Sequence, residues 1–388
     1  MAVLVVEDLG ERAVGGAPLR WRGLAAALAR HQPLVTIETD ALRREVGCGD
    51  RCDCPPASLV AYGSGRPDPY ARYGCSRAVA ALSTRIAALP RQPVIVSHLR
   101  LHRYLGAALA AGATDVAIDL HNAEADLYFE MLAHPFAVRW AGLMAGEGEA
   151  IRAVEAWACR AARLVITCSD RDADLIRERY SPRATAVIPN AVAVGPPPEP
   201  GPAATPDLLF LGAMQWFPNL HAALHLVQEI YPLLKRVLAH SSLTVAGHAP
   251  PPMLADWIAG TDAVLIADPP APRDLLAGRV LAVPLHFGGG TRLKILEAFA
   301  HGCPVISTAK GAEGLAAQPD VHYLAADTPR QFVAQLIRLT CDPIGDRRRR
   351  RAAYDLVAAD YSWPAIASSA GPVLATLSAA EATDRVAG

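Results

Sequence analysis

A chain of 388 residues is long enough for two ordinary α/β domains with separate cores. Its 52% hydrophobic and 19% charged residues are typical of a folded protein, and a formal net charge of −1 excludes a general attraction to nucleic acid. No stretch approaches the roughly 18 apolar residues of a membrane span, and the opening MAVLVVEDLG lacks the basic leader of a signal peptide, so we expect a cytoplasmic protein.

The first half of the sequence alternates apolar runs with segments of helical periodicity. The apolar runs predict strands at 3–8, 34–39, 94–98, 116–121, 164–169 and 185–190. Helical spacing predicts helices at 18–31, 76–89, 104–111 and 170–180, and a long helical region at 122–160. Repeated βα units of this kind specify an α/β fold with a mainly parallel, doubly wound sheet.

A proline-rich run, PPPEPGPAATP at 196–206, then interrupts the pattern and indicates a domain boundary, because it can pack as neither helix nor strand. Beyond it the same alternation predicts strands at 207–212, 242–247, 263–267, 279–285, 304–308 and 322–325. Further helices are predicted at 220–237, 253–260, 329–340 and 347–377, the last broken by YSWP at 361–364.

These boundaries predict two doubly wound, Rossmann-like domains at 1–195 and 207–360. A C-terminal helical segment at 361–388 follows them and could return to the first domain. Two successive domains of this kind leave a cleft between the carboxyl ends of their sheets, which is where ligands of such folds bind. We therefore expect the active site in that cleft.

The stretch FGGGTRLKILEAFAHGCPVIST at 287–308 carries the strongest chemical signal in the sequence. Three glycines, 288–290, follow an apolar run and turn into a helix, and the N-terminus of a helix attracts anions. Arg292 and Lys294 add positive charge there, and Glu297 offers an acceptor for sugar hydroxyls. A phosphate site beside a hydroxyl acceptor predicts a nucleotide sugar as the ligand.

Four cysteines in the first domain, Cys48, Cys52, Cys54 and Cys75, raise the alternative of a structural metal. Their spacing fits no common zinc pattern, in which paired ligands lie about two to four residues apart in both halves. A loop with free thiols is therefore favoured over a metal site. Scattered cysteines in a large chain are typical of reduced thiols rather than of a disulfide framework.

Several segments, in order along both domains, resemble those of the GT-B-fold retaining glycosyltransferases of family four (group 1 glycosyltransferases). They are IDLHNAEADLY (118–128), TCSDRDADLI (167–176), IPNAV (188–192), FLGAMQWFPNLHAALHLVQEIYPLL (210–234), GGGTRLKILEAFAHGCPVISTAKGAEGL (288–315) and YSW (361–363). The resemblance implies an enzyme that holds a nucleotide sugar mainly with its C-terminal domain. The N-terminal domain would then be the acceptor side.

Residue by residue, the resemblance implies that Glu297 binds the nucleotide ribose and that Arg292 and Lys294 stabilise the diphosphate. Many members touch the donor sugar with a glutamate where this chain has Gly289, so the contacts of that sugar stay unassigned. The cation pair that is usual after the first strand of the donor domain is replaced here by Met214, Gln215, Pro218 and Asn219.

Other candidates follow strand ends and loops that the family places near its substrates. His121 ends the strand in IDLHNAE, so we expect it to act on the transferring sugar; the alternative is a histidine satisfied by backbone groups. On the acceptor side the candidates are Asp119, Asn122 and Glu124, although acids near a helix start also cap it. The donor-binding candidates are Gly15, Gly16, Gly212, Gly289, Gly290, Thr291, Glu297 and Glu313, of which the loop residues have ordinary loop roles as their alternative.

We therefore predict a glycosyltransferase, by resemblance a hexosyltransferase, that moves a sugar from a nucleoside-diphosphate sugar to an acceptor hydroxyl with retention. No divalent metal or other cofactor is expected, and the acceptor class stays open between a saccharide, a lipid-linked sugar, a protein and a small metabolite. Two alternatives are a GT-B nucleotide-sugar epimerase-like enzyme and a non-catalytic nucleotide-sugar binding subunit.

Five consecutive arginines at 347–351 form the most basic run of the sequence. They indicate either a solvated helix face or a surface that contacts a partner or anionic lipid, which would place the protein peripherally at the membrane.

Overall fold

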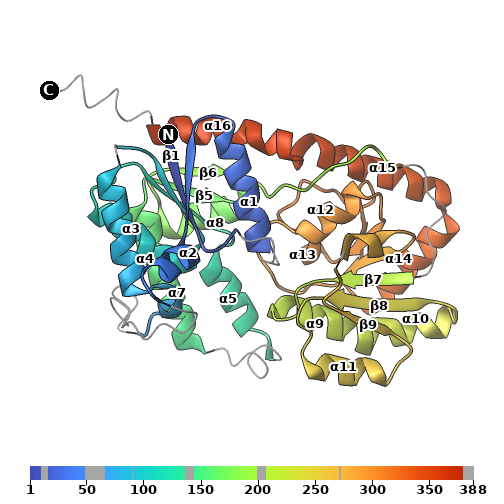
Figure 1. Cartoon of the computed structure of the whole chain (residues 1–388). Coiled ribbons are helices and arrows are strands. Elements are labelled where there is room, and N and C mark those ends of the chain that lie inside the picture. The colour runs from blue at the N-terminus through green and yellow to red at the C-terminus, as the bar shows by residue number, and fades with distance from the viewer. Residues whose placement is uncertain are drawn as a thin grey trace. The chain divides into compact units, whose positions relative to one another are not determined.

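The computed structural model of the chain describes residues 1–9, 16–48, 66–89, 91–135, 144–198, 207–270 and 272–378. Contacts between Cα atoms divide the chain into two compact units (Figure 1). Unit 1 comprises Met1–Asn190 together with Ile366–Gly388, and unit 2 comprises Ala191–Ala365. Each unit is built on a parallel sheet and is described by itself.

The sheet of unit 1 has six strands in the order β2-β1-β3-β4-β5-β6. The strands are β1 (Ala2–Val6), β2 (Leu34–Glu38), β3 (Val94–Ser97), β4 (Val116–Asp119), β5 (Leu164–Thr167) and β6 (Thr185–Val187). All neighbouring pairs are parallel. The central strands β1, β3, β4 and β5 are buried along their whole length, which explains why they read as continuous apolar runs.

The helices of unit 1 pack against this sheet and surround it. They are α1 (Gly16–Ala29), α2 (Thr39–Glu45), α3 (Ser76–Ala88), α4 (His102–Ala110), α5 (Glu124–Leu132), α7 (Ala145–Ala161) and α8 (Asp170–Tyr180). The helical region predicted at 122–160 is interrupted, because α5 ends at Leu132 and α7 begins at Ala145. Pro135 explains the end of α5, since a proline disfavours helical conformation in the residue before it.

The sheet of unit 2 also has six parallel strands, in the order β12-β11-β10-β7-β8-β9. The strands are β7 (Asp207–Leu211), β8 (Ser242–Gly247), β9 (Val264–Ala267), β10 (Val280–Val283), β11 (Val305–Ser307) and β12 (Leu324–Ala325). Two doubly wound parallel sheets confirm the α/β fold predicted from the repeated βα pattern.

The helix predicted at 220–237 is interrupted. It consists of α9 (Phe217–His225), a π-helical turn (Leu226–Ile230) and α10 (Tyr231–Val237). Pro232 accounts for the change of pitch, because it has no N–H to donate to the carbonyl four residues earlier. The remaining helices of unit 2 are α11 (Pro252–Ala259), α12 (Leu293–Ala300), α13 (Ala309–Ala312), α14 (Pro329–Cys341) and α15 (Pro343–Asp360).

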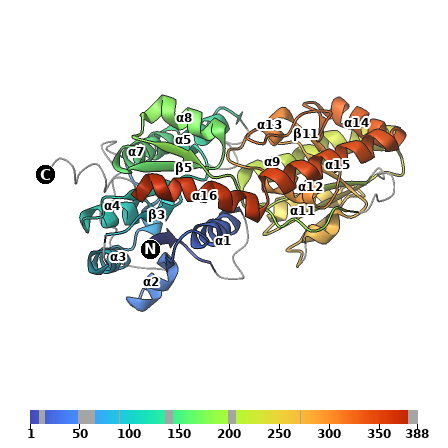
Figure 2. The ribbon, with the colours of Figure 1, turned by 90° about the horizontal axis from the view of Figure 1, so that it is seen from above.

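The arginine run lies on α15, which crosses α12 (Figure 2). Arg349 is buried, Arg350 forms an ion pair with Asp346, and Arg351 forms an ion pair with Asp355. Internal partners thus take up much of the charge of this run. No helix in the described ranges has both the length and the apolar character that a membrane crossing needs.

The last helix, α16 (Trp363–Ser378), begins in unit 2, and from Ile366 onward it belongs to unit 1. His31, just after α1, donates its Nε2 hydrogen to Ala367 O at 2.6 Å. Gly371 packs closely against the same ring, since a Cβ there would lie 2.8 Å from His31 Cε1. The C-terminal helix therefore docks beside α1.

Candidate functional site

The glycine-rich turn of unit 2 joins β10 to α12. Gly288 and Gly290 have φ angles of 147° and 66°, which glycine adopts without the strain that a side chain would add. A Cβ on Gly288 would also lie 3.0 Å from the Arg292 guanidinium. Gly289 is half-buried, and Thr291 is buried at the end of the turn. The local sequence therefore fixes the backbone path into the helix.

Arg292 is the residue that holds this turn in shape. Its guanidinium donates hydrogen bonds to the carbonyl oxygens of Gly289, of Gly290 at 3.2 Å and of Lys310 at 3.3 Å. The side chain is only 8% exposed. These contacts direct Arg292 to backbone oxygens, so it shapes the loop in addition to contributing charge near the start of α12.

Lys294 reaches from the first turn of α12 to the end of β7. Its Nζ donates to Asn219 Oδ1 at 2.7 Å and lies 4.3 Å from the centre of the Phe210 ring. Burial and the positive charge of Arg292 lower the pKa of Lys294 to about 7, while the negative charge of Glu297 opposes them. The cation is therefore poised to change its charge near neutral pH.

Gly212 follows β7 and packs tightly on both sides. A Cβ on Gly212 would lie 2.8 Å from Asn219 Cγ, and one on Gly247 would lie 1.7 Å from Gly212 O. Asn219 Nδ2 donates to Ala213 O at 2.9 Å. Close approach of two strand ends and one helix start thus requires small residues at this edge of the sheet.

Two predicted donor-binding acids carry ion pairs in unit 2. Arg273 Nε donates to Glu297 Oε1 at 3.2 Å, and Lys310 Nζ lies 2.7 Å from Glu313 Oε2.

Of the predicted glycine loop in unit 1, Gly16 is the exposed first residue of α1, whereas Gly15 lies outside the described residues.

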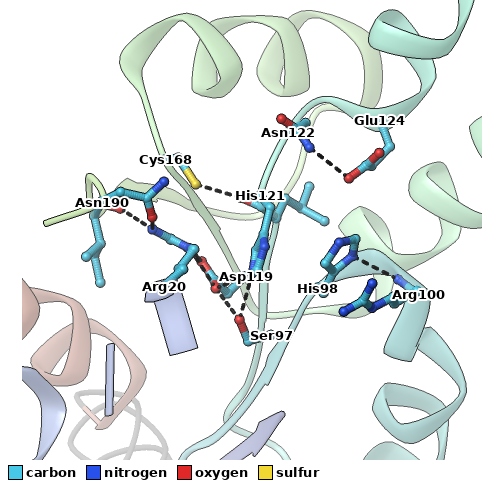
Figure 3. A network of polar contacts seen from close by, with 12 residues as sticks. Arg20, Ser97, His98, Arg100, Asp119, His121, Asn122, Glu124, Cys168 and Asn190 are labelled. Atoms are coloured by element: carbon cyan, nitrogen blue, oxygen red, sulfur yellow. Dashed lines mark hydrogen bonds and ion pairs between the residues drawn. The ribbon is translucent and has the colours of Figure 1, made fainter. Parts of the chain in front are cut away.

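The second cluster lies at the carboxyl ends of the unit 1 strands (Figure 3). Asp119, the last residue of β4, is fully buried and forms an ion pair with Arg20 of α1. Arg20 also donates to Ile188 O at 2.8 Å and to Asn190 Oδ1 at 3.0 Å. Burial alone would raise the pKa of Asp119, but the charge of Arg20 and the proximity of His121 hold it well below its usual range.

His121 is linked to this carboxylate through Ser97, as Figure 3 shows. Ser97 Oγ donates to Asp119 Oδ2 and therefore accepts from His121 Nε2, which lies 3.1 Å away. His121 Nε2 lies 3.5 Å from Asp119 Oδ2. Burial lowers the pKa of His121 more than Asp119 raises it, and Arg20 lowers it further. The contacts assign the proton of the neutral ring to Nε2, which leaves Nδ1 as a hydrogen-bond acceptor.

His98 follows β3 as His121 follows β4, and the two rings lie 4.5 Å apart between centroids. Its φ of 97° is in the left-handed region that a side chain rarely adopts. Its Nδ1 accepts from the backbone N–H of Arg100 at 3.3 Å. Burial, the neighbouring His121 and the positive charge of Arg100 hold the pKa of His98 well below its ordinary value, so the ring is neutral.

The acceptor-side candidates lie beyond His121 at the start of α5. Asn122 Nδ2 donates to Glu124 Oε1 at 3.0 Å, and burial raises the pKa of Glu124 despite that bond. The backbone N–H of Glu124 donates to Glu155 Oε1 at 2.7 Å. Glu155 of α7 therefore caps α5, and the carboxylate of Glu124 is not needed for that purpose.

Arg20, Ser97 and His98 are site residues that were not predicted from the sequence. Arg20 could have been predicted from the sequence, because it lies four and eight residues before Leu24 and Leu28, on the same buried face of α1. An arginine on the apolar stripe of a helix predicts a buried partner. Ser97 and His98 end an apolar strand, as His121 does, and the same criterion could have found them.

Two of the four cysteines considered as metal ligands lie in the described residues. Cys48 and Cys75 are buried with their sulfur atoms 3.4 Å apart, and Cys52 and Cys54 lie outside the described residues. Within the described ranges no three histidine, cysteine or acidic side chains gather as a metal would require.

A pocket of about 470 Å³ lies in unit 2 between the π-helical turn and α11, and none of the predicted site residues lines it.

Most of unit 2 matches a known protein family. Residues 205–342 match the family model for glycosyl transferases group 1. Glycogen synthase of Mycobacterium tuberculosis is 29% identical over 248 residues, which cover 58% of this chain and 56% of that protein. The chain thus spans little more than half the length of the curated relatives it matches.

Solved structures define the fold class. Sucrose-phosphate synthase from Thermosynechococcus elongatus matches with a TM-score of 0.72 at 18% identity, over 98% of this chain and 99% of that chain. Anabaena HepE in complex with UDP matches with a TM-score of 0.65 at 13% identity, over 97% and 99% of the two chains. The chain has the GT-B fold of these glycosyltransferases.

Proposed function

We propose that this protein is a retaining glycosyltransferase that moves a sugar, most simply a hexose, from a nucleoside-diphosphate sugar to an acceptor hydroxyl. The observation that carries the proposal is the turn at 288–291, which Arg292 clamps through three carbonyl oxygens while Lys294 supplies an ammonium beside it. Preorganised positive charge is what the departure of a nucleoside diphosphate demands, because the leaving group gains negative charge.

In this proposal the donor binds to unit 2. Lys294 and the start of α12 stabilise the diphosphate, and Glu297 accepts hydrogen bonds from the ribose. The glycines at 212, 289 and 290 let the backbone approach the diphosphate closely, since larger side chains would cover the turn. Diphosphate is a good leaving group, so the step needs charge stabilisation more than a general acid, and we propose that no divalent metal takes part.

In unit 1, we propose that His121 contacts the transferring sugar with Nδ1 as an acceptor. Its Nε2–H is fixed by Ser97, and Asp119 is held in turn by Arg20. Asp119 is fully buried, so we assign it a positioning role toward His121 rather than a contact with the acceptor. Asn122 and Glu124, both half-buried, are the residues of this group that we propose for the acceptor hydroxyl.

The donor to test first is UDP-glucose. A HepE structure matched by this chain contains UDP-glucose, and others contain UDP or UDP with glucose. Two other matched proteins, glycogen synthase and sucrose-phosphate synthase, are named as synthases of sugar compounds. The acceptor is a hydroxyl compound whose class, saccharide, lipid-linked sugar, protein or small metabolite, has to come from screening.

A turnover assay with and without acceptors tests the proposal. UDP-glucose is incubated with the protein alone and with a panel of saccharides and lipid-linked sugars, and UDP release and the anomeric configuration of the product are measured. Acceptor-dependent UDP release with retained configuration supports the transferase. Conversion of the sugar without any acceptor would instead indicate an epimerase-like enzyme, and tight binding without turnover would indicate a binding subunit.

A further inference from the structure

The Lys294 ammonium has a neutral partner. Nζ bonds to the amide oxygen of Asn219 at 2.7 Å and lies 4.3 Å above the Phe210 ring. Within the described part of the chain no carboxylate pairs with Lys294, and Glu297, one helical turn away, pairs with Arg273. A partly buried cation without a counter-ion is electrostatically suited to receive an anion.

Asn219 can offer only its oxygen to this ammonium. Its Nδ2 must be the group that contacts Ala213 O at 2.9 Å, since two oxygens cannot share a hydrogen bond without a hydrogen. The amide also packs on Gly212, where an added Cβ would lie 2.8 Å from Asn219 Cγ. Its orientation is thus fixed from two sides.

The turn itself brings no positive charge. From 212 to 219 the sequence GAMQWFPN contains neither lysine nor arginine. The ammonium at the end of β7 therefore comes from α12, and Asn219 is the side chain that bridges α9 to it. The titratable and charged groups that act on Lys294 are Arg292, which disfavours its charge, and Glu297, which favours it.

We propose that Asn219 is a positioning residue for the donor: it holds the Lys294 ammonium at the Gly212–Ala213 turn through a neutral acceptor, so that no carboxylate competes with the diphosphate for its charge. This inference rests on the proposed function and adds the residue that sets where the cation lies and how much charge it offers. An aspartate at the same place would have the same shape, but its carboxylate would form an ion pair with the ammonium before the nucleotide binds.

Three variants separate these effects. Asn219→Asp keeps the shape and is compatible with the start of α9, where negative charge is favourable. Asn219→Leu keeps the bulk but removes the acceptor. Gln215→Asp, at an exposed position on the same turn, adds the same charge away from the ammonium and is the matched control.

Calorimetric titration with UDP at pH 7 gives the first readout. We expect Asn219→Asp to weaken UDP binding about tenfold or more, because a fixed carboxylate competes with the diphosphate for Lys294. Gln215→Asp should stay within about twofold of the unmodified protein. Equal weakening in both variants would overturn the inference, since it would show a general effect of charge.

The second readout needs no nucleotide. The rate at which acetic anhydride acylates Lys294 is followed against pH by peptide mass spectrometry. Its titration midpoint should rise in Asn219→Asp, fall in Asn219→Leu and stay unchanged in Gln215→Asp. The same midpoint in all variants would overturn the role of Asn219. Failure of the unmodified protein to bind any nucleoside diphosphate, with these shifts observed, would instead remove the proposed function and the donor, and leave Asn219 only its effect on the charge of Lys294.

Discussion

In unit 2, Arg273 Nε lies 3.2 Å from Glu297 Oε1, so the carboxylate is held by one oxygen. Its side chain is 19% exposed, and within the described residues its second oxygen takes no hydrogen bond or ion pair. Arg273 is therefore a support that orients Glu297, and Oε2 remains as an acceptor for a hydroxyl.

The first prediction concerns that acceptor. Glu297→Ala should raise the donor KM about tenfold or more, since it removes a charge-assisted hydrogen bond to the nucleotide ribose. Steady-state kinetics at saturating acceptor measure the effect. Glu229→Ala, which removes an exposed acid paired with His225, is the control and should leave the donor KM unchanged. Unaltered donor kinetics in Glu297→Ala would refute the assignment.

The second prediction concerns pH. The ligand-free pKa of Lys294 is about 7, and a bound diphosphate raises it because negative charge favours the ammonium. Below pH 7 the lysine is charged in both states, so affinity for UDP is flat. Above pH 7 the free protein loses a proton that the complex keeps, and affinity falls by up to about tenfold per pH unit.

Calorimetry at pH 8 in buffers of different ionisation enthalpy measures the proton taken up with UDP. Uptake should approach one proton in the unmodified protein and vanish in Lys294→Met. Lys235→Met, which changes a lysine paired with Asp262, should keep the uptake. If UDP binds without proton uptake, Lys294 does not contact the diphosphate.

The third prediction separates the roles of His121 and Asp119. His121→Ala should lower kcat about 100-fold with little change in donor affinity, since the contact strengthens as charge develops on the sugar. Asp119→Asn should lower kcat by acting through His121. The double variant should then be little worse than His121→Ala alone, because the two residues work as one unit. Additive losses would mean that Asp119 acts independently.

The fourth prediction concerns stability. Glu155 is fully buried, and burial raises its pKa to about 8, although Tyr180 and two backbone N–H groups donate hydrogen bonds to it. Between its ordinary value of about 4.3 and this raised value, the folded state holds a proton that the unfolded state has released. Stability should therefore fall as pH rises through this window, by up to about 1.4 kcal/mol per unit.

Glu155→Gln cannot titrate, so its free energy of unfolding should lose this slope. Urea denaturation at pH 5, 6, 7 and 8 measures it, and the variant should gain on the order of 3 kcal/mol relative to the unmodified protein across that range. Glu149→Gln, on the exposed face of the same helix, is the control. Parallel pH profiles for Glu155→Gln and the unmodified protein would contradict the raised pKa.

Much of the fold could be predicted from the sequence, because buried strands need apolar residues along their whole length. Strands β1, β3, β4 and β5 are buried on both faces, so their apolar runs stand out, and YSWP marks the end of α15 correctly. The break after Leu132 and the π-helical turn before Pro232 were missed, because helical periodicity continues across both prolines.

The contacts of the site could not be predicted from the sequence, because they join residues that are distant along the chain. Lys294 could be picked as a cation, but its bond to Asn219 spans 75 residues, and the pair of Arg20 with Asp119 spans 99. Such contacts arise from strand ends that the sheet brings together. Sequence shows which residue types are present at those ends, and only the fold shows which of them meet.

The return of α16 has a practical consequence for dissecting this protein. Because Ile366–Ser378 packs with unit 1, beside His31, the first unit is built from two separate stretches of the chain. A gene cut after position 365, or one ending near 190, would remove the helix that His31 contacts through Ala367 and Gly371. Biochemical study of the isolated first unit therefore calls for a fused design, in which a short linker joins the N-terminal stretch directly to the last helix.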